Sequence, residues 1–333
     1  MLLRDLGEWE LLRRLGAYAP PGQLDDDAAL ISADGPPLVV NTDLLVEGVH
    51  FSDATIGPRD LGWRCAAANL SDLAAMGCGS VVGLTVGLVA PGTTPWSWVE
   101  GVYDGLAAAL ERYGGTLLGG DCSGGPQRTL AITALGRIGP GVIRRGDGQT
   151  GDWLLSTGPH GLSRLGLALL LNELPAAQAS GLSERVRQRA IEAHRRPLPR
   201  LDAVAPLAAS RPPGAPWRVA GTDSSDGLAA AVANLARGSG CAAELNRQAL
   251  PIDPDLARLP QGEPWCLAGG EDYELVLALE PAWAKALLAA LPGCSCIGQL
   301  LAPSAAQEAG GLCWQGSGEP IEAGQGYTHF RAA

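Results

Sequence analysis

Residues 36–45, PPLVVNTDLL, give the clearest indication of the first strand of the fold, because an apolar run there passes directly into polar side chains. The run predicts a buried strand that closes in Asn41, Thr42 and Asp43. Groups placed just beyond a strand lie where sheets commonly bind ligands. We therefore expect this end of the strand to belong to a functional site.

The next long stretch, residues 57–77, GPRDLGWRCAAANLSDLAAMG, predicts a helix. It begins near Pro58 and ends at Gly77, which suit the first turn and the C-terminal cap of a helix. Asn69 and Asp72 are three residues apart, so we expect both side chains on one face of this helix.

Strands and helices continue to alternate after this pair. The pattern predicts a strand at 81–89, a helix at 95–114, a strand at 116–118 that runs into Gly119, Gly120 and Asp121, and a strand at 130–138. This alternation favours an α/β or interleaved α+β domain. The Gly-rich and charged segment 139–152 is typical of a connection, so we expect two domains, 1–138 and 139–333.

The second part of the chain has its own set of predicted elements, and a short helix at 6–15 precedes the first part. The elements of the second part are strands at 153–157, 217–223, 241–245 and 294–300, a turn and strand at 269–279, and helices at 162–171, 183–196, 227–236 and 281–291. The mixture predicts an α+β domain.

Composition and charge exclude several classes of protein. The net charge of −11 argues against nucleic acid and anionic membranes as partners, because both require basic surface. No stretch has the roughly 18 uninterrupted apolar residues of a membrane span, and the charged start of the chain is unlike a signal peptide. We therefore expect a cytoplasmic protein with no membrane partner.

Lysine is almost absent from this chain, which has Lys285 as its one lysine beside 23 arginines. There is no G-x-x-x-x-G-K-[ST] loop and no H-R-D loop, so the sequence has neither P-loop nor protein-kinase machinery. Any bound phosphate must be held by arginine, backbone amides or metal. The eight cysteines lack paired zinc-site spacing and are expected to be mainly buried thiols, with a redox role for Cys294 and Cys296 as the alternative.

Carboxylates recur at the predicted strand ends, where Asp43, Asp121 and Asp223 each follow an apolar run. Others stand nearby in the sequence: Asp72, Asp226, Glu271 and Asp272. Any one of them has the alternative role of a helix cap or turn residue. Together they would repel one another in a shared pocket unless divalent cations were present, and oxygen ligands without His or Cys select Mg²⁺ or Mn²⁺.

Residues 23–31, QLDDDAALI, place three aspartates before an apolar run. A solvated turn is the simple interpretation. In an extended segment, alternation would direct Asp25 and Asp27 to one face and Asp26 to the other.

Eight motifs together resemble the thiamine-monophosphate kinase family. They are LGEWELLRRL, DDAAL, NTDLLVEGVHF, AANLSDLAAMG, GGD, DSSDGL, GGEDYEL and GYTHF. They follow the family's order and approximate spacing over essentially the whole chain. The family belongs to the superfamily of aminoimidazole ribonucleotide synthetase and selenophosphate synthetase.

The resemblance implies a fold and an assembly. We expect a homodimer whose N-terminal α/β domains form a shared β-barrel, with ATP and Mg²⁺ bound by that domain. A C-terminal α+β domain would complete the nucleotide and substrate site. The implied reaction is ATP-dependent phosphorylation of thiamine monophosphate to thiamine diphosphate, with several Mg²⁺ ions and K⁺ as a candidate additional ion.

The resemblance also implies roles for individual residues. Metal ligands fall on Asp27, Asn41, Thr42, Asp43, Asp72, Asp121, Asp223 and Asp226. Nucleotide contacts fall on Gly120, Asp121, Arg145 and Ser225, and thiamine phosphate contacts fall on His50, Glu271 and Tyr327. Asp43, Asp121 and Arg145 are the residues expected to act in catalysis. Without the resemblance, His50 would be interpreted as a packed or capping histidine and Tyr327 as an ordinary residue of the tail that covers the core.

The chain departs from the family pattern at a few positions. Asp25 stands where glycine is usual, Asn41 where serine is common, and residues 119–125 read GGDCSGG in place of a form with two threonines and an arginine. No carboxylate ligand is lost, so we expect activity with altered nucleotide affinity. The alternatives are another ATP-dependent member of the superfamily, similar to aminoimidazole ribonucleotide synthetase, and a non-catalytic protein that binds thiamine phosphates or divalent cations.

Overall fold

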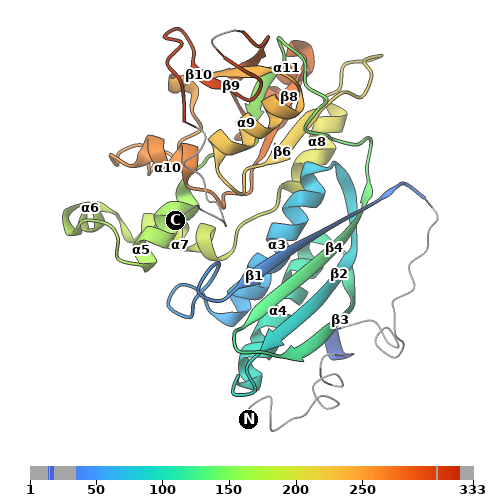
Figure 1. Cartoon of the computed structure of the whole chain (residues 1–333), viewed down its shortest axis with the longest axis vertical. Coiled ribbons are helices and arrows are strands. Elements are labelled where there is room, and N and C mark those ends of the chain that lie inside the picture. Colours follow the sequence, from blue (N-terminus) through green and yellow to red (C-terminus); the bar gives the residue numbers. More distant parts are fainter. Residues whose placement is uncertain (1–13, 15, 19–34, 305–306, 323–333) are drawn as a thin grey trace. The chain divides into compact units, whose positions relative to one another are not determined.

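The structure is a computed structural model that describes Arg14 and residues 16–18, 35–304 and 307–322 (Figure 1). Apart from Arg14, the predicted helix at 6–15 lies outside the described residues, as do Asp25, Asp26, Asp27 and Tyr327. The chain divides into two compact units, which are described separately. The first comprises Met1–Leu73 and Cys78–Gly139, and the second comprises Ala74–Gly77 and Pro140–Ala333.

The first unit contains a four-stranded sheet in the order β1-β4-β2-β3. Its strands are β1 (Leu38–Val46), β2 (Cys78–Ala90), β3 (Thr116–Gly124) and β4 (Thr129–Ile138). Only the β2–β3 pair is parallel; β1 with β4 and β2 with β4 are antiparallel. A crossover helix joins β2 to β3, as a parallel pair requires.

Two long helices cover one face of this sheet, α3 (Pro58–Ala75) and α4 (Trp96–Tyr113) (Figure 1). α3 begins at the predicted Pro58 and ends at Ala75, two residues before the predicted cap at Gly77. α4 has both predicted ends, because it follows Pro95 and is capped by Gly114. In β4, buried residues such as Leu130 and Ile132 alternate with partly exposed ones, as expected for a strand with one covered face. A short 3₁₀ helix, η1 (Gly16–Tyr18), precedes the sheet in the sequence.

The prediction for the first strand was wrong in two respects. β1 does not close at 41–43 but continues to Val46, and among the described residues it is an edge strand whose partner is β4. It is also not buried on both faces, since Leu38, Val40 and Leu44 are 43%, 63% and 56% exposed. Polar residues are accommodated within β1 because successive side chains of a strand point to opposite faces of the sheet.

Glycines allow α3 and α4 to approach at the level of their backbones. A Cβ atom on Gly105 would lie 1.9 Å from the carbonyl oxygen of Arg59, and one on Gly62 would lie 1.9 Å from that of Val102. A Cβ atom on Gly101 would likewise lie 2.9 Å from Cγ of Pro58. The GxxxG spacing in α4 and the single glycine in α3 therefore determine how closely the two helices pack.

The second unit contains a six-stranded sheet in the order β10-β7-β9-β5-β8-β6. Its strands are β5 (Trp153–Ser156), β6 (Ala220–Asp223), β7 (Ala242–Leu245), β8 (Leu275–Leu279), β9 (Ser295–Leu301) and β10 (Leu312–Trp314). Its helices are α5 (Leu162–Leu170), α6 (Ala176–Gly181), α7 (Glu184–Arg195), α8 (Val204–Ala209), α9 (Leu228–Gly238), α10 (Gly262–Ala268) and α11 (Pro281–Ala290), with η2 (Arg200–Ala203) and η3 (Arg247–Ala249). The sequence did not predict α6, α8 or α10.

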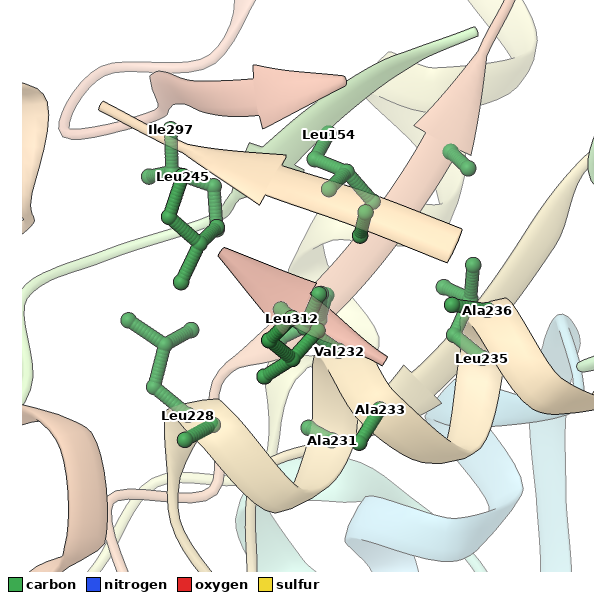
Figure 2. Packing of buried hydrophobic residues seen from close by; sticks show 14 of the residues in the cluster. Leu154, Leu228, Ala231, Val232, Ala233, Leu235, Ala236, Leu245, Ile297 and Leu312 are labelled. Carbon is green, nitrogen blue, oxygen red and sulfur yellow. The ribbon is translucent and has the colours of Figure 1, made fainter. Parts of the chain in front are cut away.

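Hydrophobic clusters cover both faces of this second sheet. On one face, apolar residues of α9 such as Leu228 and Val232 pack near Leu154, Leu245 and Ile297 of the strands (Figure 2). The other face carries a second cluster of strand residues with α8 and α11. Burial from both sides explains why every residue of β8, LVLAL, is apolar and buried.

The beginning of α5 is held by the carboxylate of Asp272. Its two oxygens accept hydrogen bonds from the backbone amides of Gly161 at 2.8 Å and Ser163 at 3.2 Å. Such bonds satisfy amides that a helix leaves unpaired at its first turn. Burial nevertheless raises the pKa of Asp272 to about 7, and the amide bonds oppose this rise only in part.

The cysteines divide into two groups of four. Cys65, Cys78, Cys241 and Cys266 are buried, as expected, whereas Cys122, Cys294, Cys296 and Cys313 are only partly buried. All eight are free thiols. Among the described residues, no helix is long and apolar enough to cross a membrane.

We expect Gly105→Ala to destabilise the protein, because its methyl group would overlap the Arg59 carbonyl. Overpacking costs typically about 1–3 kcal/mol, and the alanine recovers up to ~1 kcal/mol of helix propensity. Because the overlap is with a backbone atom, the upper end of this cost applies, and urea unfolding should show a net loss of about 2 kcal/mol. Gly124→Ala is the control, since a Cβ there meets nothing within 4 Å. Equal stability of both variants would contradict this account of the helix pair.

We expect Asp272 to make unfolding dependent on pH. With a folded-state pKa of about 7 and an unfolded value of about 4, the folded protein keeps a proton that the unfolded chain loses between these pH values. The contribution of Asp272 to the unfolding free energy should thus fall as pH rises toward 7, by about 1 kcal/mol per pH unit. Asp272→Asn cannot titrate and keeps an oxygen acceptor for the amides. Urea unfolding from pH 5 to 8 should give a flatter profile for this variant than for wild type.

The matched control for the loss of one carboxylate is Glu308→Gln, which changes an exposed residue of the same unit. Parallel pH profiles for wild type and Asp272→Asn would contradict the prediction.

Candidate functional site

Three polar side chains of the first unit meet between β1 and α3. The amide nitrogen of Asn41 donates to Oδ1 of Asn69 at 3.1 Å and to Oδ2 of Asp72 at 2.9 Å. Asn69 and Asp72 therefore share one face of α3, as the spacing predicts, and that face points toward β1. The strand thus contributes an amide, and the helix contributes an amide and a carboxylate.

The same cluster includes Asp43, whose backbone amide donates to Oδ1 of Asn69 at 3.2 Å. Oδ1 of Asn41 is buried and makes no hydrogen bond with any residue that the structure describes. A buried carbonyl oxygen without a partner costs about 1–3 kcal/mol, so such atoms commonly have a ligand. An oxygen-rich environment of this kind suits a hard cation.

The three consecutive residues predicted as metal ligands do not point the same way. Asn41 and Asp43 face α3, whereas the hydroxyl of Thr42 faces the opposite side and pairs with Thr133 of β4 at 2.8 Å. Strand alternation requires this division. Any contact of Thr42 with a ligand on the α3 side therefore has to come from its backbone.

Gly120 and Asp121 lie within β3 and not beyond its end, so the predicted pattern of carboxylates after strands is wrong for Asp121 as well as for Asp43. Only Asp223 ends its strand. A Cβ on Gly120 would lie 2.0 Å from the carbonyl oxygen of Val86, so packing of β3 on β2 requires glycine here. Asp121 follows directly and is exposed.

His50 lies in the tight turn that follows β1. Its Nδ1 accepts a hydrogen bond from the backbone amide of Val46 at 3.0 Å, so the neutral ring carries its proton on Nε2. Arg128 holds the same region by ion pairs with Glu47 and Asp53 and stacks over Trp98. These contacts orient the turn and the imidazole.

In the second unit, predicted site residues gather around the end of β6. Asp223 is buried there, and its Oδ1 accepts a hydrogen bond from the Ser225 hydroxyl at 3.0 Å. Asp226 follows and is exposed. Nε of Arg145 donates to the hydroxyl of Thr222 at 3.1 Å, which places this guanidinium beside the same strand end.

Glu271 belongs to a backbone segment that packs on the loop containing Ser225. Its amide donates to the carbonyl of Ser225 at 2.7 Å, and Gly270 before it has a φ of +68°. Glu271 and Tyr273 also have positive φ, +59° and +54°, which is rare for residues with side chains. Such strained backbone is typical of functional segments. Oε2 of Glu271 lies 3.7 Å from Nδ1 of the buried His194.

A buried polar network behind these loops was not predicted. His160 is fully buried, and its Nε2 lies 2.9 Å from the hydroxyl of Ser224, which also accepts the amide of Glu274 at 3.1 Å. Burial lowers the pKa of His160 to about 4, so the ring is neutral near pH 7. Glu274 in turn pairs with Arg200. The network joins four chain segments that are remote in sequence.

The sequence contains a signal for only some residues of this network and of the cluster between β1 and α3. Ser224 stands inside the DSSDGL motif, but its partner is 64 residues away. Asn69 was placed on the correct helix face, yet its contacts with β1 depend on tertiary packing. Among the described residues, no three His, Cys, Asp or Glu side chains form a group that could hold a metal ion. Asp27 and Tyr327 lie outside those residues.

Two family models match the chain. The AIR synthase related protein N-terminal domain matches residues 25–138, and the corresponding C-terminal domain matches residues 149–306. A thiamine-monophosphate kinase of Prochlorococcus marinus is 50% identical over 299 residues, covering 90% of each chain. The thiamine-monophosphate kinase of Escherichia coli K12 is 35% identical, covering 97% of this chain and 98% of its own.

Solved structures of thiamine-monophosphate kinases also match this chain. AaThiL complexed with AMPPCP and TMP matches with a TM-score of 0.75 at 27% identity, covering 99% of each chain. The thiamine-monophosphate kinase of Stenotrophomonas maltophilia matches with a TM-score of 0.76 at 29% identity, covering 93% of this chain and 95% of that one. Both structures support the mixed α and β architecture with two domains. The chain therefore belongs to the thiamine-monophosphate kinase family of AIR synthase related proteins.

Proposed function

We propose that this protein transfers the γ-phosphoryl group of ATP to thiamine monophosphate, forming thiamine diphosphate and ADP. The observation that carries the proposal is the 50% identity to a thiamine-monophosphate kinase over 90% of both chains. The structure of AaThiL with AMPPCP and TMP supports the same pair of substrates, because the match covers the whole of both chains to within 1%.

Mg²⁺ fits the residues of the first unit. The buried Oδ1 of Asn41 has no partner among the described residues, and the carboxylate of Asp72 lies beside the same amide. Oxygen donors of this type match Mg²⁺. The proposed ligands in the whole chain are Asp27, Asn41, Thr42, Asp43, Asp72, Asp121, Asp223 and Asp226. When bound, Mg²⁺ would neutralise charge on the phosphates and align them for transfer.

Nucleotide contacts are assigned to Gly120, Asp121, Arg145 and Ser225. Gly120 has no side chain and packs against Val86, so its contact would be through the backbone. Ser225 is already oriented by its hydrogen bond to Asp223, and Arg145 is oriented by its bond to Thr222. These bonds reduce the conformational freedom that binding would otherwise have to remove.

The proposed reaction needs no general base. The acceptor is a phosphate monoester, whose second pKa is about 6, so its oxygen is largely ionised at neutral pH. The obstacle is repulsion between two anions. The guanidinium of Arg145 supplies a fixed positive charge, and positioning of this kind is the main contribution that proteins make to phosphoryl transfer. A chain with one lysine can therefore perform this chemistry.

Substrate contacts are assigned to His50, Glu271 and Tyr327. The imidazole of His50 has its proton on Nε2, which suits a phosphate or hydroxyl oxygen as acceptor. The carboxylate of Glu271 suits the cationic thiazolium ring of thiamine. K⁺ as a further ion, and the cytoplasmic location, stay predictions from the sequence.

We also propose the homodimer, on the basis of the second face of β1. Val40 and Leu44 expose 63% and 56% of their surface there. Exposed apolar side chains gathered on one face favour association with another surface. A second copy of this face would cover them, as in the shared β-barrel that the family resemblance implies.

The function is tested by mixing the protein with ATP, Mg²⁺ and thiamine monophosphate and measuring thiamine diphosphate and ADP. We expect both products in equal amounts. Tight binding of thiamine monophosphate without ADP would instead support a binding protein. ADP formed only with formylglycinamidine ribonucleotide would support a relative of aminoimidazole ribonucleotide synthetase.

In the same assay, Asp43→Asn and Asp121→Asn should each lower kcat by about 100-fold or more, the loss expected when one electrostatic contact to the reacting groups is removed. Circular dichroism and urea unfolding should show that both variants remain folded. Glu111→Gln, an exposed change on α4, is the control and should retain wild-type turnover. Near wild-type rates in the two aspartate variants would contradict their assigned roles.

For the dimer, light scattering after gel filtration should give the mass of two chains for wild type. The double variant Val40→Glu with Leu44→Glu should give the mass of one, because two charges would be buried in the apolar contact. Leu171→Glu with Leu198→Glu changes exposed leucines of the second unit and serves as the control. A wild-type monomer would contradict the proposal.

A further inference from the structure

Asn69 makes three hydrogen bonds within and beside the cluster between β1 and α3. It is fully buried, with 0% of its surface exposed. Its Nδ2 donates to the carbonyl oxygen of Cys65 at 2.9 Å, one turn earlier in α3. Its Oδ1 accepts from Nδ2 of Asn41 at 3.1 Å and from the amide of Asp43 at 3.2 Å.

We infer that Asn69 is a positioning residue, which orients the side chain of Asn41 toward the metal and holds the backbone of Asp43 in place beside it. The inference rests on the proposed function, since it concerns the same Mg²⁺ site. Asn69 itself is not a ligand in this scheme, because both of its polar atoms are already used by protein groups.

The hydrogen bonds specify the orientation of each amide in turn. The Cys65 carbonyl is only an acceptor, so the nitrogen of Asn69 must face it and the oxygen must face β1. That oxygen and the carboxylate of Asp72 are both acceptors, so Asn41 must direct its nitrogen toward them. Its own oxygen is then directed away from the helix. This is the buried oxygen that has no partner among the described residues.

A flipped Asn41 would place its oxygen against two acceptors and lose both hydrogen bonds. Presentation of the oxygen and not the nitrogen matters because only the oxygen binds a cation. Partners of this kind, one layer behind metal ligands, typically change metal affinity by about 10–100-fold when removed.

A purely structural role makes a different prediction. Asn69 also ties β1 to α3, so its loss would lower stability in either case. If that were its only role, metal affinity would be unchanged in the molecules that remain folded. The two roles therefore separate when stability and metal affinity are measured in the same variants.

The test uses Mn²⁺ as the probe, with binding followed by electron paramagnetic resonance in the presence of AMPPCP, so that turnover is not required. Asn69→Ala should raise the Kd for Mn²⁺ about tenfold. Asn69→Asp keeps an acceptor for Asn41 and Asp43 but loses the donor to Cys65, so it should lose stability yet bind Mn²⁺ within about threefold of wild type or tighter. Asn69→Ser is measured in the same way if the alanine variant does not fold.

Leu70→Val is the matched control, because Leu70 is the next residue of α3 and is also fully buried. It should lose stability in urea unfolding and keep the wild-type Kd. If Asn69→Ala binds Mn²⁺ like wild type, the positioning role is wrong, while wild-type conversion of thiamine monophosphate would leave the proposed function intact. Wild-type protein that neither binds Mn²⁺ nor forms thiamine diphosphate would overturn both.

Discussion

In β1, successive side chains point to opposite sides of a sheet edge, and the two sides have different chemistry. Asn41 and Asp43 point toward α3, where Asn69 and Asp72 meet them. Val40 and Leu44 point the other way and are largely exposed. Because alternation has a period of two, one strand provides polar groups for binding and apolar groups for association without conflict.

In the second unit, a buried polar network behind the loops supports the predicted site residues. Ser224 bonds His160 and the Glu274 amide, and so links the end of β6 to two other segments. The neighbouring residues Asp223 and Ser225 therefore start from a supported backbone. Positive φ values at Glu271 and Tyr273 add local strain, which the surrounding hydrogen bonds have to offset.

Local signals explain what the sequence could predict. α3 and α4 were predicted at nearly their true lengths, since proline and glycine mark helix ends through backbone geometry alone. The helix α10 was missed because its sequence GEPWCLA contains glycine and proline, which usually mark turns. β1 was predicted too short because polar residues were interpreted as its end, although tertiary contacts with α3 accommodate them. The contacts of Asn69 and His160 likewise depend on packing between distant segments.

The pairing of β1 with β4 has a further consequence for how the chain must fold. Asn41 pairs with Ala134 and Asp43 with Ile132. A slip of one residue in this register would exchange the two sides of β1. The side chains of Asn41 and Asp43 would then face water, and those of Val40 and Leu44 would face α3. Hydrophobic burial alone would tolerate that error. The shifted register would lose the hydrogen bonds from Asn41 and Asp43 to Asn69, so the polar cluster also favours the correct alignment of β1 with β4.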